Sequence, residues 1–247
     1  MTTTDKILCM LPTFNRPQRL ATLIYSALDN ADIKERVHFC LCVHVSDNLT
    51  REALPSIIDG FANRVQIVDE DTDQPNLPYY FNKMYDETTH RDALVSMLGD
   101  DMRFMTPSWD TQVLTAIAQA DGKAIVFGDD AYIAHDKLCV HFFTTRKIVE
   151  VTQKPFMCPI FHAEMIDVIW FLFGQSTETL RYLPDMVIKH EHDSGKKDEE
   201  RDFTYMRMQP LRNQANSLAN NQRIAFAYAT VMAANAIKNG VGKWNVL

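Results

Sequence analysis

Short apolar runs alternate with segments of helical periodicity through the first half of the chain. Between residues 16 and 29 the apolar positions follow the i, i+3, i+4, i+7 spacing of one helix face. Thr13 or Asn15 can cap this helix, and Pro17 fits its first turn. The apolar runs themselves predict strands at residues 6–11, 37–45, 65–68, 93–98 and 123–128.

Strands and helices follow each other in strict alternation over the first 128 residues, with a further helix predicted after Thr106 as its cap. This order is typical of an α/β protein whose parallel sheet carries helices on both faces. Ligands bind such sheets beyond the carboxyl ends of the strands. Polar motifs follow four of the strands at that edge: "PTFNR", "SDN", "GDD" at 99–101 and "GDD" at 128–130.

The second half of the chain has a less regular pattern. "CVHFFTTRKIVEV" predicts a hairpin or edge strands, "AEMIDVIWFLFG" an apolar helix, and "LRYLPDMVIKHEH" a strand that ends in two histidines. The pattern of residues 216–238 predicts a long Ala-rich helix. We expect one main domain at 1–212 and a C-terminal segment, 213–247, whose helix packs on the core; pairing with a second copy is the alternative.

Composition and charge narrow the class of protein. The chain has 247 residues, 46% of them apolar, and a formal net charge of −7, so it has no bulk attraction to nucleic acid or to an anionic membrane. It has no run of 18 apolar residues, and its N-terminal residues do not read as a signal peptide. Five cysteines in or near apolar runs are typical of reduced, buried thiols, which predicts a cytoplasmic protein.

Asp100 and Asp101 stand side by side where a buried strand ends. Carboxylate oxygens are ligands that Mg²⁺ and Mn²⁺ prefer, and such an ion would offset the repulsion between the two charges while bridging a diphosphate. The alternative is an exposed turn in which the carboxylates cap the next helix. Asp129 and Asp130, in the second "GDD", are interpreted as a turn.

His190 and His192 alternate at a strand end, so their side chains share a face, and imidazole is a common ligand for Mn²⁺. The loop that follows carries Lys196 and Lys197, either of which could close over a phosphate. A plain charged loop is the alternative.

Other candidates come from the remaining strand exits. Backbone amides at a helix N-terminus favour anions, and Thr or Asn can contact a base or ribose. The candidates of this kind are Pro12, Thr13, Asn15, Arg16, Asp47, Asn82 and Lys83.

The order of these motifs resembles the nucleotide-sugar-binding half of family-2-like glycosyltransferases of the GT-A fold. "ILCMLPTFNRPQRL", "VHVSDN", "FNKMYD" and "SMLGDDMRFMTPSWD" carry the resemblance, which covers residues 6–120 well and continues loosely to "IKHEHDSGKKD". It implies a Rossmann-like, mostly parallel sheet flanked by helices, with a nucleotide-sugar half at about 1–130, an acceptor half at about 131–212 and a C-terminal helical extension.

The resemblance also implies roles for individual residues. Asp101 would hold Mn²⁺ or Mg²⁺, His192 or His190 would complete the metal site, and Asp100 would contact the ribose or the metal. The nucleotide would be held by Thr13, Arg16, Asp47, Asn82, Lys83 and Lys196.

The chain departs from the family pattern at two places. Gly99 replaces the first acidic residue of the usual Asp-x-Asp motif, and no Glu-Asp pair marks the catalytic base. The base candidates are Glu164, Asp167, Glu178 and Asp185. We prefer Asp185, which follows a proline and precedes the histidine strand; without a base, the protein would be a retaining enzyme or an inactive binder.

The predicted function is transfer of a sugar from a nucleotide-diphosphate donor, with UDP favoured, to a hydroxyl of a glycan or of a modified nucleobase in DNA. A nucleotidyltransferase is disfavoured because "PTFNRP" lacks a glycine-rich phosphate loop, and a polymerase because the chain is too short and acidic. A non-catalytic nucleotide-sugar-binding domain stays open, as does assembly of a homo-oligomer.

Overall fold

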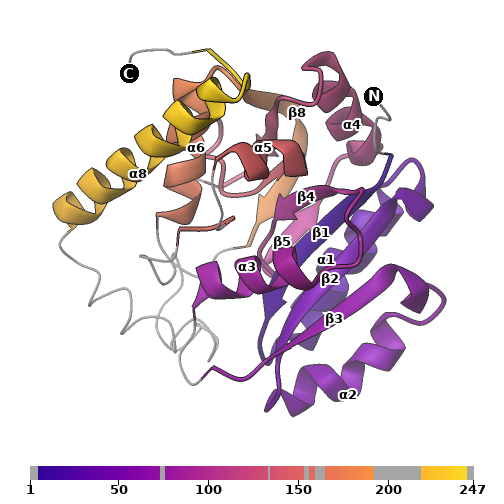
Figure 1. Ribbon diagram of the computed structural model, residues 1–247. Helices are drawn as coiled ribbons and strands as arrows, with labels where there is room; N and C mark the ends of the chain where they lie inside the picture. Colours follow the sequence, from indigo (N-terminus) through magenta and orange to yellow (C-terminus); the bar gives the residue numbers. More distant parts are fainter. Residues whose placement is uncertain are drawn as a thin grey trace.

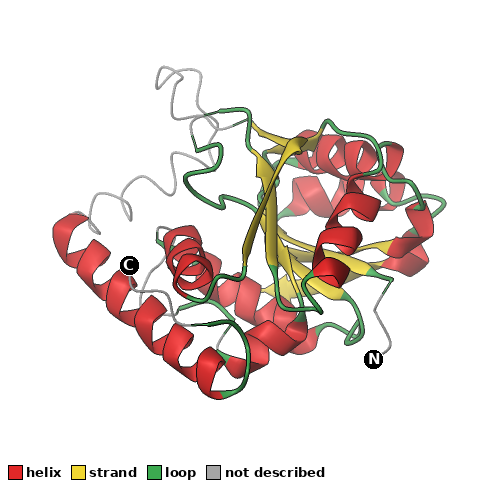
Figure 2. Ribbon diagram, turned by 90° about the horizontal axis from the view of Figure 1, so that it is seen from above, coloured by secondary structure: helices red, strands yellow, loops and turns green. Residues whose placement is uncertain are grey.

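The computed structural model describes residues 5–72, 76–132, 134–152, 156–158, 165–191 and 218–243. These residues form one eight-stranded sheet with the order β3-β2-β1-β4-β7-β6-β8-β5 and helices on both of its faces (Figures 1 and 2). The strands are β1 (Ile7–Thr13), β2 (Val37–His44), β3 (Val65–Glu70), β4 (Leu94–Met97), β5 (Met102–Phe104), β6 (Ile125–Asp129), β7 (Phe142–Thr144) and β8 (Leu180–His190).

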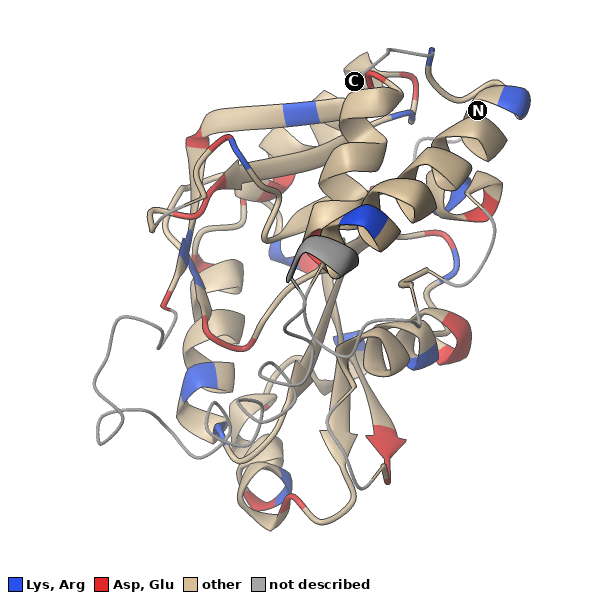
Figure 3. Ribbon diagram, turned by 90° about the vertical axis from the view of Figure 1, so that its left-hand side faces the viewer, with Lys and Arg blue, Asp and Glu red and all other residues tan. Residues whose placement is uncertain are grey.

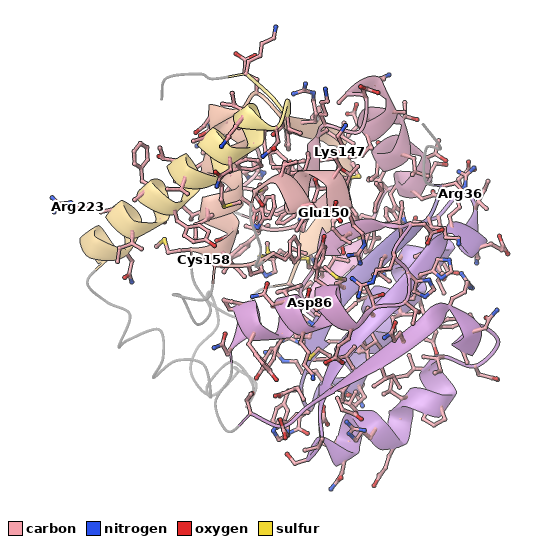
Figure 4. All side chains as sticks on the ribbon, in the orientation of Figure 1. Arg36, Asp86, Lys147, Glu150, Cys158 and Arg223 are labelled. Carbon is pink, nitrogen blue, oxygen red and sulfur yellow. The ribbon has the colours of Figure 1, made fainter. Side chains whose placement is uncertain are left out.

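The helices form two layers. They are α1 (Pro17–Asp29), α2 (Asn48–Ile57), α3 (Leu77–Glu87), α4 (Trp109–Gln119), α5 (Arg146–Val151), α6 (Ile166–Ser176) and α8 (Leu218–Lys238), with single 3-10 turns η1 (Lys34–Arg36) and η2 (Ala62–Arg64). One core cluster joins α1, α2 and α4 to the sheet, and the other joins α3, α5, α6 and α8 to it. Side chains fill both layers (Figure 4).

The first four strands confirm the predicted parallel arrangement. β3, β2, β1 and β4 run parallel to one another, so their carboxyl ends meet at one edge. Alternate residues of β1 enter opposite cores: Leu8 and Met10 face one helix layer, while Cys9 and Leu11 face the other. Both faces are covered, which explains why these strands are continuously apolar in sequence.

The predicted hairpin or edge strands around residue 142 are wrong. β7 lies inside the sheet, antiparallel to β4 and β6, and all three of its residues are buried. The chain then enters α5, with the Thr145 side chain accepting from the Ile148 amide as its cap. The sheet is therefore mixed, with its parallel half on the side of β1.

Two predicted helix caps are also wrong. α4 begins at Trp109, and the Thr106 hydroxyl instead bonds the β8 backbone, donating to the Asp185 carbonyl at 3.0 Å and accepting from the Val187 amide at 2.8 Å. α1 begins at Pro17 without a side-chain cap. The nearby Thr13 hydroxyl bonds a residue beyond β4, because the ends of β1 and β4 are adjacent.

α8 packs along α6, and both contribute to the same core cluster. Small side chains at Ala229, Ala233 and Ala236 are buried, which lets the two helices approach closely. None of the described helices combines the length and apolar character that a membrane crossing requires. All five cysteines are buried, and none of them forms a disulfide. Basic and acidic residues are interspersed over the described elements (Figure 3).

Candidate functional site

Asp100 lies just beyond β4 and is only 5% exposed. Its Oδ2 accepts a hydrogen bond from the Thr13 hydroxyl at 2.8 Å, and its Oδ1 forms an ion pair with the Arg16 guanidinium at 2.8 Å. Burial raises the pKa of Asp100 to about 6, although Arg16 opposes the rise; the neighbouring charge of Asp101 adds to it. Arg16 is thus the positive group that allows two adjacent carboxylates at this strand end.

Asp101 faces His190 across the start of the β5–β8 pair. Its Oδ1 lies 3.4 Å from His190 Nε2, and both side chains are 16% exposed. The register sets this contact, since Met102 pairs with His190 and the Glu191 amide donates to the Asp101 carbonyl at 2.7 Å. Burial lowers the pKa of His190, but the hydrogen bond and the charge of Asp101 outweigh it, so the pKa is raised overall.

This oxygen and this nitrogen fit one divalent ion. Two adjacent ligands, each about 2.1 Å from an ion, lie about 3 Å apart. The separation of Asp101 Oδ1 and His190 Nε2 is close to that value. A metal ion held by both atoms would take the place of the contact between Asp101 and His190.

Asp47 lies at the second strand exit, but its side chain is fully buried. Its Oδ1 accepts from the Thr50 amide at 2.9 Å as the cap of α2, and its Oδ2 accepts from the Asn15 amide at 2.8 Å. Asn15 has a φ of 56°, so this bond fixes an uncommon backbone conformation in the loop after β1. Asp47 therefore stabilises the conformation of that loop.

Asn82 and Lys83 lie on α3. The Asn82 amide bonds the Met157 backbone in both directions, at 3.0 Å to its carbonyl and 2.7 Å from its amide. Lys83 forms an ion pair with Glu87 one helical turn away, at 2.6 Å. Asn82 therefore joins α3 to the segment at 156–158.

Other predicted residues are separate from this cluster or outside the described chain. Asp185 precedes His190 by five residues on β8, which is roughly 16 Å of strand. Its side chain is exposed and its carbonyl bonds Thr106, so the structure does not bring it to Asp101. Pro12 is the half-buried penultimate residue of β1. His192 and Lys196 lie outside the described residues, as does Glu164.

Polar groups at the ends of β1, β2 and β3 were missed in the sequence. The ring of His44 meets Phe14 edge-on at 5.7 Å, and its Nε2 lies 4.0 Å from Glu70 Oε1. Glu70 is 5% exposed, and its Oε2 accepts from the Thr72 amide and hydroxyl at 2.8 and 2.6 Å. The acidic run "DEDTD", directly after the apolar run at 65–68, is the sequence signal that could have indicated Glu70.

Asp167 is half-buried in the first turn of α6. Its Oδ1 accepts from the Val168 amide at 2.8 Å, and its charge contributes to the raised pKa of His190. Among the base candidates from the sequence, Asp167 is therefore one whose charge acts on the Asp101–His190 pair.

Asp129 and Asp130 form the predicted turn. Asp129 Oδ1 accepts from the Ala131 amide at 2.6 Å and lies 3.0 Å from His135 Nδ1, while Asp130 Oδ1 accepts from the His135 amide at 2.8 Å. One potential ligand atom from each of Asp129, Asp130 and His135 lies within 4.8 Å of the others. This group is a second place where a cation could bind.

Comparison with known proteins gives a fold and no close relative. No family model and no curated protein matches the sequence. Among solved structures, TarS from S. aureus aligns with a TM-score of 0.60 and 8% identity over 83% of this chain, and this chain spans 39% of the TarS chain. TarS residues 1–349 have also been solved with UDP-GlcNAc, with a TM-score of 0.60 over 94% of this chain and 73% of that one.

Two further structures are similar over most of both chains. The mannosyltransferase PcManGT from Pyrobaculum calidifontis, solved with GDP-Man and Mn²⁺, has a TM-score of 0.55 and 14% identity over 94% of this chain and 75% of its own. Glucosyl-3-phosphoglycerate synthase from Mycobacterium tuberculosis, solved with Mn²⁺, UDP and glucosyl-3-phosphoglycerate, has a TM-score of 0.57 and 12% identity over 93% and 80%. The chain therefore has the GT-A glycosyltransferase fold, as its motif order predicted.

Proposed function

We propose that this chain is a metal-dependent glycosyltransferase that moves a hexose-like sugar from a nucleotide-diphosphate donor to a hydroxyl acceptor. The observation that carries the proposal is the meeting of Asp101 and His190 beside the Thr13–Asp100–Arg16 cluster at the carboxyl edge of a GT-A sheet. Nucleotide diphosphates and Mn²⁺ in the similar structures support it.

Asp101 and His190 would hold Mn²⁺ or Mg²⁺, with His192 as the candidate further ligand. The bound ion would neutralise charge on the diphosphate leaving group. Asp100, held by Thr13 and Arg16, would accept a hydrogen bond from a ribose hydroxyl. Lys196 would approach the diphosphate.

The base of the nucleotide would lie over the ends of β1–β3. Phe14 and His44 offer ring surfaces there, and Glu70 is the carboxylate nearest to His44. Asp47 and Asn15 would keep this loop in shape. Asn82 and Lys83 would contact the nucleotide from α3, and Pro12 would lie beside it near the end of β1. UDP is the favoured nucleotide, and GDP is the alternative supported by the mannosyltransferase.

Asp167 is the catalytic base in this proposal, in place of Asp185. As an acceptor oxygen attacks the anomeric carbon, the bond to the nucleotide diphosphate breaks and the carboxylate takes the hydroxyl proton. The half-buried position of Asp167 in the first turn of α6, from which its charge acts on His190, supports this role, whereas Asp185 lies five residues from His190 along β8. This chemistry inverts the anomeric centre.

The organisation of the chain follows from the same proposal. Residues 1–130 would bind the donor and 131–212 the acceptor, with 213–247 as a helical extension on the core. A glycan is the favoured acceptor, and a modified nucleobase in DNA is the alternative. Five buried thiols that form no disulfide support a cytoplasmic location.

Thermal unfolding with UDP, GDP, CDP or dTDP, each with Mn²⁺ or with EDTA, tests the proposal. A ligand that binds only the folded state raises the midpoint. We expect one nucleotide to stabilise the protein in a Mn²⁺-dependent manner, and Asp101→Ala to remove that dependence. No shift with any nucleotide would overturn the proposal. Binding without release of sugar from the donor, in either hydrolysis or transfer, would favour a non-catalytic binding domain.

A further inference from the structure

Asp130 is buried beside His190 of the proposed metal site. Its side chain is 1% exposed and holds the loop at 131–135, accepting from the backbone amides of Tyr132, Ala134 and His135 at 3.4, 3.2 and 2.8 Å. The loop contains left-handed backbone at Ala131 and His135, so it needs such bonds to persist.

The same loop holds His190 in two ways. The Asp130 carbonyl accepts from the His190 amide at 2.9 Å, which fixes the backbone of that residue beyond the β5–β8 pairing. The Tyr132 ring lies edge-on to the His190 ring at 6.4 Å, which restricts the imidazole on one side. The side chain of Asp130 shapes the loop, and the loop positions the backbone and the ring of His190.

We propose that Asp130 is a positioning residue for the proposed metal site, acting through the loop at 131–135 and His190. The inference rests on the proposed function, because it takes His190 as a metal ligand. Residues outside the ligand set that orient a metal-bound histidine typically change metal affinity 10- to 100-fold when they are substituted. Asp130 would act in this manner through backbone bonds.

The ring of His135 provides the control. His135→Ala keeps the backbone amide that donates to Asp130 and removes the ring nitrogen that lies 3.0 Å from Asp129. Asp129 stays unchanged in this comparison, because it accepts from the Ala131 amide and so holds the same loop. The His135 ring also belongs to the group of Asp129, Asp130 and His135 that could itself hold a cation. His135→Ala therefore separates the two possible places for the ion.

The experiment measures Mn²⁺ affinity by electron paramagnetic resonance of the free ion, without nucleotide. We expect Asp130→Asn to weaken binding about 10-fold and Asp130→Ala to weaken it more, because Asn keeps one acceptor oxygen for the loop amides. Tyr132→Ala should weaken it by a smaller factor. His135→Ala should bind Mn²⁺ as the wild type does, because it keeps the backbone amide that Asp130 holds. Far-UV circular dichroism and the unfolding midpoint identify variants that fail to fold.

The outcomes separate this inference from the proposed function. If the wild type binds no Mn²⁺, or if Asp101→Ala binds it unchanged, the metal site itself is wrong and the inference falls with it. If the wild type binds through Asp101 but folded Asp130→Asn and Tyr132→Ala bind equally well, the positioning role is wrong. If His135→Ala loses the ion, Mn²⁺ binds in the Asp129–Asp130–His135 group, and the inference is overturned.

A merely structural role for Asp130 predicts a different pattern. General destabilisation would lower the midpoint without changing the Mn²⁺ dissociation constant measured well below it. A positioning role changes that constant in the folded protein. Asp130→Asn should bind Mn²⁺ more tightly than Asp130→Ala, because the asparagine oxygen can still accept hydrogen bonds from the loop amides.

Discussion

At the scale of single residues, the site depends on groups that satisfy one another across long sequence separations. The Arg16–Asp100 pair joins residues 84 positions apart, and its side chains are 12% and 6% exposed. Breaking a buried pair by removing one partner leaves the other charge without compensation. The side chains proposed to bind the donor would therefore also contribute to stability.

Arg16→Ala should lower the free energy of unfolding by about 3 kcal/mol, because it leaves Asp100 buried without its cation. Urea denaturation measures this value. The double variant Arg16→Ala/Asp100→Asn should recover part of the loss, since the orphaned charge is removed. Equal stability of the single and double variants would contradict the explanation.

The packing around Gly99 explains why no side chain is present at this position, where the resemblance leads us to expect an acidic residue. A Cβ at this residue would lie 2.5 Å from Asp101 Oδ1, the atom that faces His190. Gly99→Ala should therefore turn the Asp101 side chain away and weaken Mn²⁺ binding about 10-fold, with little change in stability because only a side chain must move.

Gly60→Ala is the control for that substitution. Gly60 has a φ of 82° and open space around its Cβ position, so alanine there should cost about 1–2 kcal/mol through backbone strain and leave Mn²⁺ affinity unchanged. In titration calorimetry, Gly99→Ala should lose Mn²⁺ affinity and Gly60→Ala should keep it. In denaturation, Gly60→Ala should lose stability and Gly99→Ala should largely keep it. Normal Mn²⁺ binding by Gly99→Ala would remove this account of the motif.

His38 makes stability depend on pH. Its ring lies 4.4 Å from that of His90, and burial lowers its pKa to about 4, with His90, Lys6 and Arg64 acting in the same direction and Asp92 against it. The unfolded chain, with a usual histidine pKa near 6.5, binds the proton first. Stability from this residue is thus complete above about pH 6.5 and is lost between there and about pH 4.

The measurement compares wild type with His38→Gln at pH 7 and pH 5. Asp100 changes stability in the opposite direction, because its raised pKa makes the folded state take up a proton first below about pH 6. The difference between the two proteins isolates His38. We expect the wild type to lose more stability than the variant on acidification, and an equal loss in both would contradict the assignment.

At the scale of elements, β8 makes the site by changing partner along its length. Leu183 pairs with Gly128 on β6, but Asp129 next pairs with Val187, so the residues between form a bulge. Beyond it, β8 turns to β5 and places His190 opposite Met102. Bulges are typical of strands that re-aim a side chain near a site.

Gly128→Ala should destabilise the protein by at least about 3 kcal/mol, because a Cβ there would overlap the Met186 carbonyl in the bulge. Thermal and chemical denaturation measure the loss. Gly122→Ala is the control, since its Cβ would meet only the Thr145 methyl, at 3.8 Å, and its φ of 72° carries ordinary strain. Equal effects of the two substitutions would mean that the bulge tolerates a side chain.

At the scale of the whole molecule, α8 belongs to the fold and is not an appendage. It covers α6, and the Lys243 amide after it donates to the Thr177 carbonyl at 3.1 Å. Trp170 and Phe173 on α6 are in the same buried cluster as Ala229 and Ala233. An uncovered α6 would present this apolar surface to water.

A chain truncated after residue 217 should therefore fail to form a stable second half. We expect low soluble yield or strong binding of the dye ANS, which reports exposed apolar surface, while Phe226→Ser should behave as the wild type because Phe226 is 49% exposed. A truncated protein with a normal unfolding transition would show that α8 is dispensable.

The sequence predicted the part of the fold that depends on local pattern. β1 and β2 are apolar throughout because both faces are covered, and this pattern is visible along the chain. The interior position of β7, the use of the Thr106 hydroxyl and the location of Asp185 depend on which strands become neighbours, so local periodicity could not give them. Asp100 was found as a strand-end residue, but its pairing with Arg16 required the adjacency of β1 and β4.

In the proposed function, the Arg16–Asp100 ion pair would weaken the attraction of the site for a cation. Because Arg16 cancels one of the two adjacent negative charges, a divalent ion held by Asp101 and a neutral imidazole would have one carboxylate as a direct ligand from this pair. The diphosphate would then supply further negative charge in contact with the ion. Metal and donor would then bind with positive cooperativity, each raising the affinity of the other by the same factor. A cell poor in free metal would thereby load this protein only when donor is abundant.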